Sequence, residues 1–138
     1  MERGRRAKIT EHPVGSKEKS MLLVQMVRDR KAQDVVVLDL RALVGFTDYF
    51  VICTGRSDRQ VQAIAEHLEK QCKGLAFKAR AIEGLPAARW VLMDFEDVVV
   101  HIFQPQVREF YDLEGLWSDA PRLEIPAEPE SGEEQWEA

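Results

Sequence analysis

Few side chains in this sequence could do chemistry, and the first candidate is a loop that could hold an anion. Thr54-Gly55-Arg56-Ser57 lies between an expected strand and an expected helix, where free backbone N–H groups can bind a negative charge. Gln60 follows Ser57 by three residues, which is the spacing of a capping box. Because a capping serine uses those same N–H groups, the sequence favours a helix cap over an anion site.

A second candidate is a pair of acidic residues. Asp94 and Asp97 flank a short polar stretch, and aspartate is common in turns because its side chain hydrogen-bonds to nearby backbone. As catalytic carboxylates they lack a third acidic partner or a basic clamp for phosphate. The histidines, His12, His67 and His101, do not have the spacing of metal ligands. The sequence therefore predicts no metal site.

The two cysteines offer no better centre. Cys53 is expected in a buried strand and Cys72 at a helix end, and no His/Cys spacing accompanies them. We expect both to be reduced, inert thiols, which is typical of the cytoplasm. The sequence therefore predicts no catalytic residue, no cofactor and no enzymatic activity.

Length and composition indicate one small domain. The chain has 138 residues, of which 45% are hydrophobic and 31% charged, as in ordinary globular proteins. No apolar run reaches the ~20 residues that span a bilayer, and the N-terminus lacks the apolar segment of a secretory signal. Residues 21–118 hold 12 basic and 14 acidic residues, and this near-neutral charge argues against general binding to nucleic acid through phosphate neutralisation.

Charge is divided unevenly between the two ends. Residues 1–20 hold six basic and three acidic residues, whereas residues 119–138 hold one basic and seven acidic residues. Neither end shows apolar periodicity, so we expect disordered tails at 1–19 and 119–138 around a domain at 20–118. A basic tail that touches RNA is the alternative for the N-terminal segment.

Periodicity and turn residues predict the elements that position these side chains. A helix should follow Ser20 as its N-cap, and Gly115 should interrupt the last helix. In chain order, the expected elements are a helix (21–31), two strands (34–40 and 48–54), a helix (57–72), a strand (75–82), a hairpin (89–103) and a helix (105–117). The order α-β-β-α-β-β-β-α predicts an α/β (α+β) fold, with a five-stranded mixed sheet and flanking helices.

The hairpin has two chemically different faces. If Phe95 and Glu96 are the central turn residues, Trp90 pairs with His101, and alternation assigns the other side chains. One face is apolar and is typical of a core: Val91, Met93, Val98, Val100 and Ile102. The other face combines aromatic, acidic and histidine side chains: Trp90, Leu92, Asp94, Asp97, Val99, His101 and Phe103.

The second face indicates a surface that binds another protein. Tryptophan is enriched at interface hot spots because it supplies a large area at low entropic cost. The alternative is that Trp90 packs beneath a loop or helix, but its polar rim favours an interface. The candidate partner-binding residues are Trp90, Leu92, Asp94, Asp97 and His101.

Several segments resemble the iojap-related ribosomal silencing factors, the RsfS family. The first signature is similar to Asp48-Tyr49-Phe50-Val51-Ile52-Cys53-Thr54-Gly55, followed by Val61-Gln62-Ala63-Ile64-Ala65. The second is similar to Glu83-Gly84, Trp90-Val91-Leu92-Met93-Asp94-Phe95 and Asp97-Val98-Val99-Val100-His101-Ile102-Phe103. The closing segment is similar to Arg108, Tyr111, Leu113-Glu114 and Leu116-Trp117. The resemblance runs from about Asp34 to Trp117, and its pieces keep the family's order and spacing.

The resemblance implies a domain related in fold to the nucleotidyltransferases but without their catalytic motif. It implies a factor that binds the large ribosomal subunit, chiefly its ribosomal protein number fourteen. By obstructing the small subunit, such a factor represses translation when nutrients are scarce. The family's important tryptophan falls on Trp90, and Asp94, Asp97 and His101 accompany it on the sheet. Homodimers are also implied for some members.

Glu96 departs from the family pattern, which commonly has glycine at this turn position. A two-residue hairpin turn needs a positive φ, which costs glutamate more than glycine, so a longer loop is the alternative. Two rival functions also stay open. One is assembly of the large subunit, and the other is a degenerate nucleotidyltransferase that uses Thr54-Gly55-Arg56-Ser57 with Asp94 and Asp97.

Overall fold

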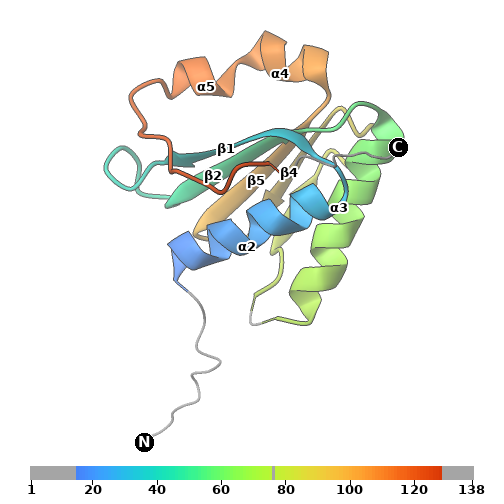
Figure 1. Cartoon of the computed structure of the whole chain (residues 1–138), viewed down its shortest axis with the longest axis horizontal. Helices are drawn as coiled ribbons and strands as arrows, with labels where there is room; N and C mark the ends of the chain where they lie inside the picture. Colours follow the sequence, from blue (N-terminus) through green and yellow to red (C-terminus); the bar gives the residue numbers. More distant parts are fainter. Residues whose placement is uncertain (1–14, 76, 129–138) are drawn as a thin grey trace, which may run out of the picture.

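The computed structural model describes residues 15–75 and 77–128, and it places one sheet between two pairs of helices (Figure 1). In chain order the elements are α2 (Ser16–Asp29), β1 (Gln33–Asp39), β2 (Tyr49–Thr54), α3 (Asp58–Lys73), β3 (Ala81–Glu83), β4 (Trp90–Asp94), β5 (Val98–Phe103), α4 (Pro105–Tyr111) and α5 (Leu113–Leu116). The strand order is β1-β2-β5-β4-β3. Strands β2 and β5 are parallel and the other neighbours antiparallel, which confirms the expected five-stranded mixed sheet.

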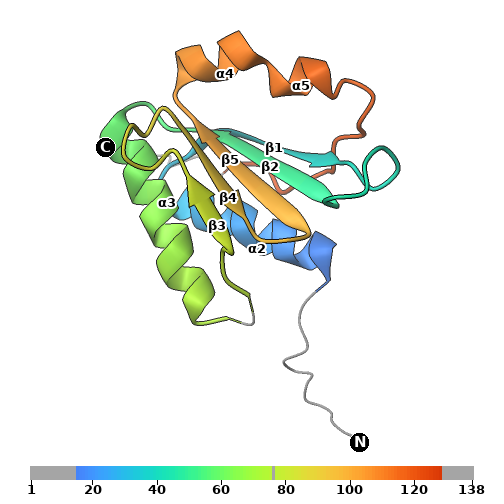
Figure 2. The same cartoon turned by 180° about the vertical axis from the view of Figure 1, so that it is seen from behind.

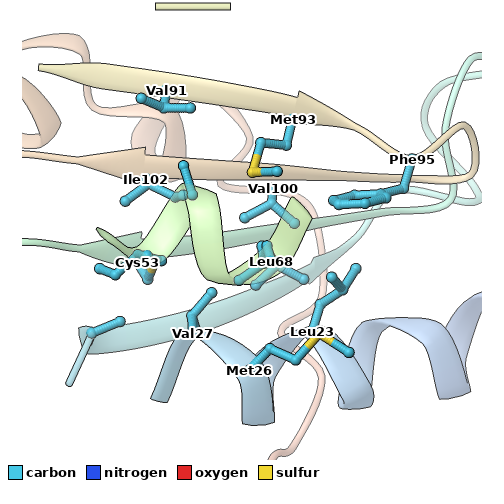
Figure 3. Close-up of a cluster of buried hydrophobic side chains, with 14 of the residues drawn as sticks. Leu23, Met26, Val27, Cys53, Leu68, Val91, Met93, Phe95, Val100 and Ile102 are labelled. Atoms are coloured by element: carbon cyan, nitrogen blue, oxygen red, sulfur yellow. The ribbon is translucent and has the colours of Figure 1, made fainter. Parts of the chain in front are cut away.

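The two faces of the sheet carry separate apolar cores. Helices α2 and α3 cover one face, and Figure 3 shows the hairpin residues Val91, Met93, Val100 and Ile102 pointing toward them. The expected apolar face of the hairpin is therefore confirmed as core. Helices α4 and α5 lie over the opposite face, where side chains from β1, β2, β5 and the residue after β1 form a second buried cluster: Leu38, Leu40, Phe50, Ile52, Val99 and Phe103.

The register of the hairpin differs from the predicted one by two residues. Trp90 pairs with Phe103 rather than with His101, and Phe95 N–H donates to Val98 O at 2.9 Å, so Glu96 and Asp97 are the central turn residues. Glu96 has a φ of 83°, a positive value that costs glutamate more than glycine. Because a shift of two residues leaves each strand side chain on its original face, the predicted faces are correct for the strand residues. Asp97 was predicted on the second face but is a turn residue.

Helix α2 begins earlier than predicted. It starts at Ser16, and Gly15 rather than Ser20 is its N-cap. Ser20 is buried inside the helix, and its hydroxyl donates to Ser16 O at 2.9 Å. The expected tail at 1–19 therefore contributes its last residues to the fold, while residues 1–14 lie outside the described part of the chain.

The added turn of α2 brings Lys19 to the tip of the hairpin. Lys19 is only 7% exposed, and its Nζ donates to Asp97 Oδ1 at 2.6 Å and to Phe95 O at 3.2 Å. The same ammonium lies 4.9 Å from the centre of the Phe77 ring, a distance suited to a cation–π contact. Lys19 thus ties α2 to the turn in which Glu96 has a positive φ.

The strand expected at 75–82 is mostly wrong, because only Ala81–Glu83 are paired as β3. Phe77 instead turns into the core and meets Phe95 edge-on, with 6.0 Å between ring centres. Figure 2 shows β3 as a short strand at the edge of the sheet remote from β1.

The C-terminal segment closes the other edge of the sheet. Asp39 N–H donates to Pro121 O at 2.8 Å and Leu123 N–H donates to Val37 O at 2.9 Å, so the segment runs beside β1. Ala120 belongs to one core, whereas Leu123 packs against the other. The disorder expected from residue 119 is therefore wrong for this segment, and residues 129–138 lie outside the described part of the chain.

The last helix is interrupted at Asp112 rather than at Gly115. Asp112 has a left-handed backbone, with φ 47° and ψ 58°, and its carboxylate accepts the Gly115 N–H at 3.0 Å to cap α5. A Cβ at Gly115 would collide with this carboxylate, so the glycine permits the cap that separates α4 from α5. No helix among residues 15–75 and 77–128 is long and apolar enough to cross a membrane.

Replacement of Lys19 tests the link between α2 and the hairpin. Lys19→Met keeps the apolar stem but removes the donors to Asp97 and Phe95, and we expect it to lower the free energy of unfolding by about 1 to 3 kcal/mol. Lys17→Met on the same helix is the matched control, because Lys17 is exposed. Urea denaturation measures both. An equal loss for the two variants would contradict the link.

Candidate functional site

Trp90, the first residue of β4, stands where the second face of the sheet meets α4. Its ring stacks on buried Phe103, with 4.8 Å between centres, and its other neighbour is Tyr111 of α4, at 4.9 Å. A Cβ at Gly84 would collide with the Trp90 carbonyl oxygen, so the Glu83-Gly84 turn needs glycine to pass this close. Trp90 is half-buried, which leaves part of the indole available to a partner.

His101 orients Trp90 from beneath. The Trp90 Nε1–H donates to His101 Nδ1 at 3.1 Å, and the imidazole is only 3% exposed. Burial lowers the pKa of His101 to about 4, so the ring is neutral at pH 7 and accepts the indole proton. Its Nε2 has no hydrogen-bond partner among the described residues. In this structure His101 supports the candidate surface from below, since a partner could not reach its ring.

The other predicted site residues divide between the two sides of the hairpin. Leu92 is half-buried and lies opposite His101 in the ladder. Asp94 accepts from Arg80 Nε at 3.1 Å and from the Glu96 N–H at 2.8 Å, so its carboxylate holds the turn. Asp97 is bound by Lys19 from α2, which covers the opposite face. The structure thus brings together Trp90, Leu92 and His101 but separates Asp97 from them.

Exposed apolar side chains of α4 and α5, of which Tyr111 contacts Trp90, were not among the predicted site residues. Phe110 is 79% exposed, Tyr111 52% and Leu116 71%. Successive helical residues point about 100° apart, so Phe110 and Tyr111 cannot both face the sheet, and that adjacency is the signal that could have found them. Between α4 and the turn before β4 is a hollow of about 250 Å³, lined by Gly84, Ala87, Arg89, Trp90, Val107 and Tyr111.

In the loop before α3, backbone N–H groups are hydrogen-bonded to side chains of the same segment. Ser57 Oγ accepts the Gln60 N–H at 3.1 Å, which confirms the predicted cap. The Gln60 side chain accepts the Arg56 N–H at 2.7 Å and donates to the carbonyls of Arg30 and Lys31. These contacts use the N–H groups that an anion would need.

A polar hollow of about 530 Å³ next to Thr54 is also poorly suited to phosphate. Its lining includes four carboxylates, from Asp34, Glu109, Asp112 and Glu114. The one buried cation there is Arg108, which pairs with Glu114 at 2.9 Å and donates to Thr54 Oγ1 at 2.8 Å. Arg108 also lowers the pKa of Glu114 through their hydrogen bonds. Because the hollow is lined by carboxylates and its arginine is already paired, it does not suit a nucleotide phosphate.

The remaining chemical candidates are the two cysteines and a possible metal site. Cys53 and Cys72 are free and buried, and burial raises their pKa values to about 12 and about 11. Both thiols are therefore protonated at neutral pH, where the thiolate would be the reactive form. Across the described ranges, no three His, Cys, Asp or Glu residues are arranged to hold a metal ion.

The buried imidazole predicts an acid-sensitive fold. The pKa of His101 is about 4 when folded and about 6.5 when unfolded, so the unfolded chain binds more protons between these values. Stability contributed by the neutral ring is complete above pH 6.5 and falls by about 3 kcal/mol as the pH drops to 4. We expect the His101→Gln variant to lack this pH dependence. The titration of carboxylates should affect the variant and the unchanged protein equally. Urea denaturation from pH 4 to 7 measures it, and parallel pH profiles would contradict the assignment.

Comparison with known proteins places this arrangement in a family. The model of the family described as "Ribosomal silencing factor during starvation" matches residues 13–138. A ribosomal silencing factor of Halalkalibacterium halodurans is 43% identical over 112 residues, covering 81% of this chain and 96% of the relative. The mouse protein named mitochondrial assembly of ribosomal large subunit protein 1 is 36% identical over 108 residues, which cover 76% of this chain and 47% of the mouse protein.

A solved structure agrees with these sequence matches. A crystal structure from Bacillus halodurans superposes with a TM-score of 0.72 at 42% identity, covering 80% of this chain and all of that one. The identity is high over nearly the whole length of the Halalkalibacterium halodurans relative. The chain belongs to the ribosomal silencing factor family, RsfS.

Proposed function

We propose that this protein binds the large ribosomal subunit through the surface around Trp90 and sterically blocks joining of the small subunit. Acting in the cytoplasm without catalysing a reaction, it would repress translation when nutrients are limiting. Membership of the silencing-factor family is the observation that carries the proposal. Ribosomal protein number fourteen, implied by the family resemblance, is the proposed contact on the large subunit.

The local structure supports a docking role for Trp90. Its indole is fixed by one hydrogen bond and by stacking on Phe103, so little conformational freedom remains to be lost on binding. Its exposed side adjoins Tyr111, and both line the hollow beside α4. A rigid, half-buried aromatic next to a hollow is the arrangement that protein interfaces use as an anchor. Leu92 and Asp94 extend this surface along the strand.

Assembly of the large subunit is the second candidate. The name of the mouse relative favours it, because that protein is described by large-subunit assembly. Both candidates use the same partner and differ in the particle recognised. Sedimentation of cell extracts separates them: a silencing factor is expected on mature large subunits, and an assembly factor on their immature precursors.

The nucleotidyltransferase alternative gains no support from the site. In the loop at 54–57, Ser57 caps α3 and the Gln60 side chain accepts the Arg56 N–H, and the neighbouring hollow carries carboxylates. Homodimerisation, also implied by the resemblance, stays a proposal that sedimentation of the purified protein over a concentration series would test.

A subunit-joining experiment tests the proposed function. Purified large and small subunits are mixed with the protein, and whole ribosomes are separated from free subunits by sedimentation. We expect whole ribosomes to decrease with added protein, because the docked domain occupies the joining face. Undiminished formation of whole ribosomes at saturating protein would sink the proposal.

The Trp90→Ala variant tests the proposed site in a binding experiment with purified large subunits. Loss of a central aromatic anchor typically costs 2 kcal/mol or more, so we expect binding to purified large subunits to weaken by at least about thirtyfold. Leu75→Ala is the control, since Leu75 is exposed and lies just after α3. Far-ultraviolet circular dichroism checks that each variant is folded. A folded Trp90→Ala protein that binds normally would remove Trp90 from the site.

A further inference from the structure

Helix α2 carries an apolar groove on a side that the core leaves uncovered. Two hollows, of about 400 and about 500 Å³, lie along this helix, and Met21 and Gln25 line both of them. Because these two residues are four positions apart, they lie on one face of the helix, and the hollows form one continuous groove. It extends from Lys17 near the start of α2 to Arg28 in the last turn, and we call it the α2 groove.

The centre of the α2 groove is an apolar side chain that packing has left half open. Leu23 and Val27 anchor the helix in the core and are 0% exposed. Met21 is half-buried, and among the described residues it is not part of that core. A further apolar group that covered Met21 would remove its open surface from water, which is favourable.

The last described residues form one wall of the groove. Leu123 pairs with β1 and Ile125 packs against the core, so the chain is held beside α2. Arg28 Nη1 donates to Pro126 O at 2.8 Å, and Pro126 and Ala127 line the second hollow. The described chain ends one residue later. The segment 129–138 therefore continues from the edge of the groove.

This segment contains one large apolar side chain, Trp136, eight positions after Glu128. Eight residues span at most about 26 to 29 Å when fully extended. The groove from Lys17 to Arg28 is about 17 Å long, at roughly 1.5 Å per helical residue. Trp136 is thus within reach of every part of the α2 groove.

Covalent attachment favours this segment over other occupants. A group tethered by a short segment has an effective concentration on the order of millimolar, about a thousandfold above that of a second copy at micromolar concentration. Residues 1–14 are tethered to the other end of α2, but they contain no aromatic side chain. The indole of Trp136 offers the larger apolar area.

The charge of the segment also suits the groove. Residues 129–138 contain four glutamates and no lysine or arginine. At one end of the groove, Arg28 Nε is buried without a hydrogen-bond partner among the described residues. The two carboxylates of the lining are engaged within the fold, since Asp29 contacts His67 Nε2 at 3.1 Å and Glu18 accepts a backbone N–H of the helix cap. An arginine with an unsatisfied donor favours an acidic occupant.

We infer that residues 129–138 dock in the α2 groove, with the Trp136 ring over Met21 and the glutamates beside Arg28. The docked segment covers the open apolar side of α2 with a part of the same chain. Because α2 lies on the face of the sheet opposite to α4 and α5 (Figure 1), this docking leaves the Trp90 surface uncovered. The inference therefore stands independently of the proposed function.

Oxidation of Met21 by hydrogen peroxide tests the docking in the full chain. Covering a thioether slows its conversion to the sulfoxide, and peptide mapping by mass spectrometry gives the rate at each methionine. We expect Trp136→Ser to speed oxidation of Met21 about threefold, as for a tethered contact that is closed about two-thirds of the time. Trp136→Phe keeps an aromatic ring and should retain most of the protection.

Two controls show what the Met21 rate reports. Gln135→Ser changes the neighbouring position of the same segment and should leave the rate at Met21 unchanged. Met93 of the hairpin is 0% exposed, so its rate measures loosening of the whole fold and should be equal in all variants. Protection by a tethered segment is independent of protein concentration, whereas protection by a second copy rises with it.

Each other outcome overturns the inference. Equal rates at Met21 in Trp136→Ser and the unchanged protein mean that Trp136 does not cover the groove. Protection that grows with protein concentration assigns the groove to a second copy. Faster oxidation of Met93 together with Met21 in Trp136→Ser indicates a loosened fold and not an opened groove. Weaker binding of Trp136→Ser to purified large subunits places the segment at the Trp90 surface instead.

Discussion

The hydrogen bond from Trp90 Nε1 to the buried Nδ1 of His101 is the interaction on which the candidate surface depends. It requires a neutral imidazole, which burial secures by lowering the pKa of His101 to about 4. With the indole fixed on Phe103, Tyr111 has a flat surface to pack on, and α4 takes its place over the sheet. The exposed aromatic surface is therefore an extension of the core.

The surrounding fold protects this arrangement at both edges of the sheet. The C-terminal segment pairs with β1 through Pro121 and Leu123, and the opposite edge strand, β3, has three residues preceded by Lys78 and Arg80. Short, charged or covered edges do not recruit further strands. The proposed docking therefore uses side chains on the α4 and α5 side, and Lys19 holds the hairpin tip from the other side.

The sequence predicted the sheet, the α3 cap and the two faces of the hairpin, because these follow from local periodicity. The faces were correct despite a wrong register, since an error of two residues preserves alternation. It did not predict the start of α2, whose first turn is polar and whose Lys19 finds partners 76 and 78 residues away. The pairing of Leu123, which lies in a Pro/Glu-rich segment, was not predicted either, because its partner Val37 is distant in the chain. The sequence could not rank the predicted site residues. The structure shows that His101 supports Trp90 from below and that Asp94 and Asp97 hold the turn, whereas Trp90 itself is half-exposed.

The protein is proposed to dock on the large subunit through the side chains around Trp90. Oxidative footprinting by mass spectrometry, with the protein free and bound to purified large subunits, tests this docking. We expect strong protection of Trp90, Tyr111 and Phe110 in the complex and an unchanged rate at Leu75. Equal oxidation of the three aromatic residues in the free and bound protein, with protection elsewhere, would contradict it.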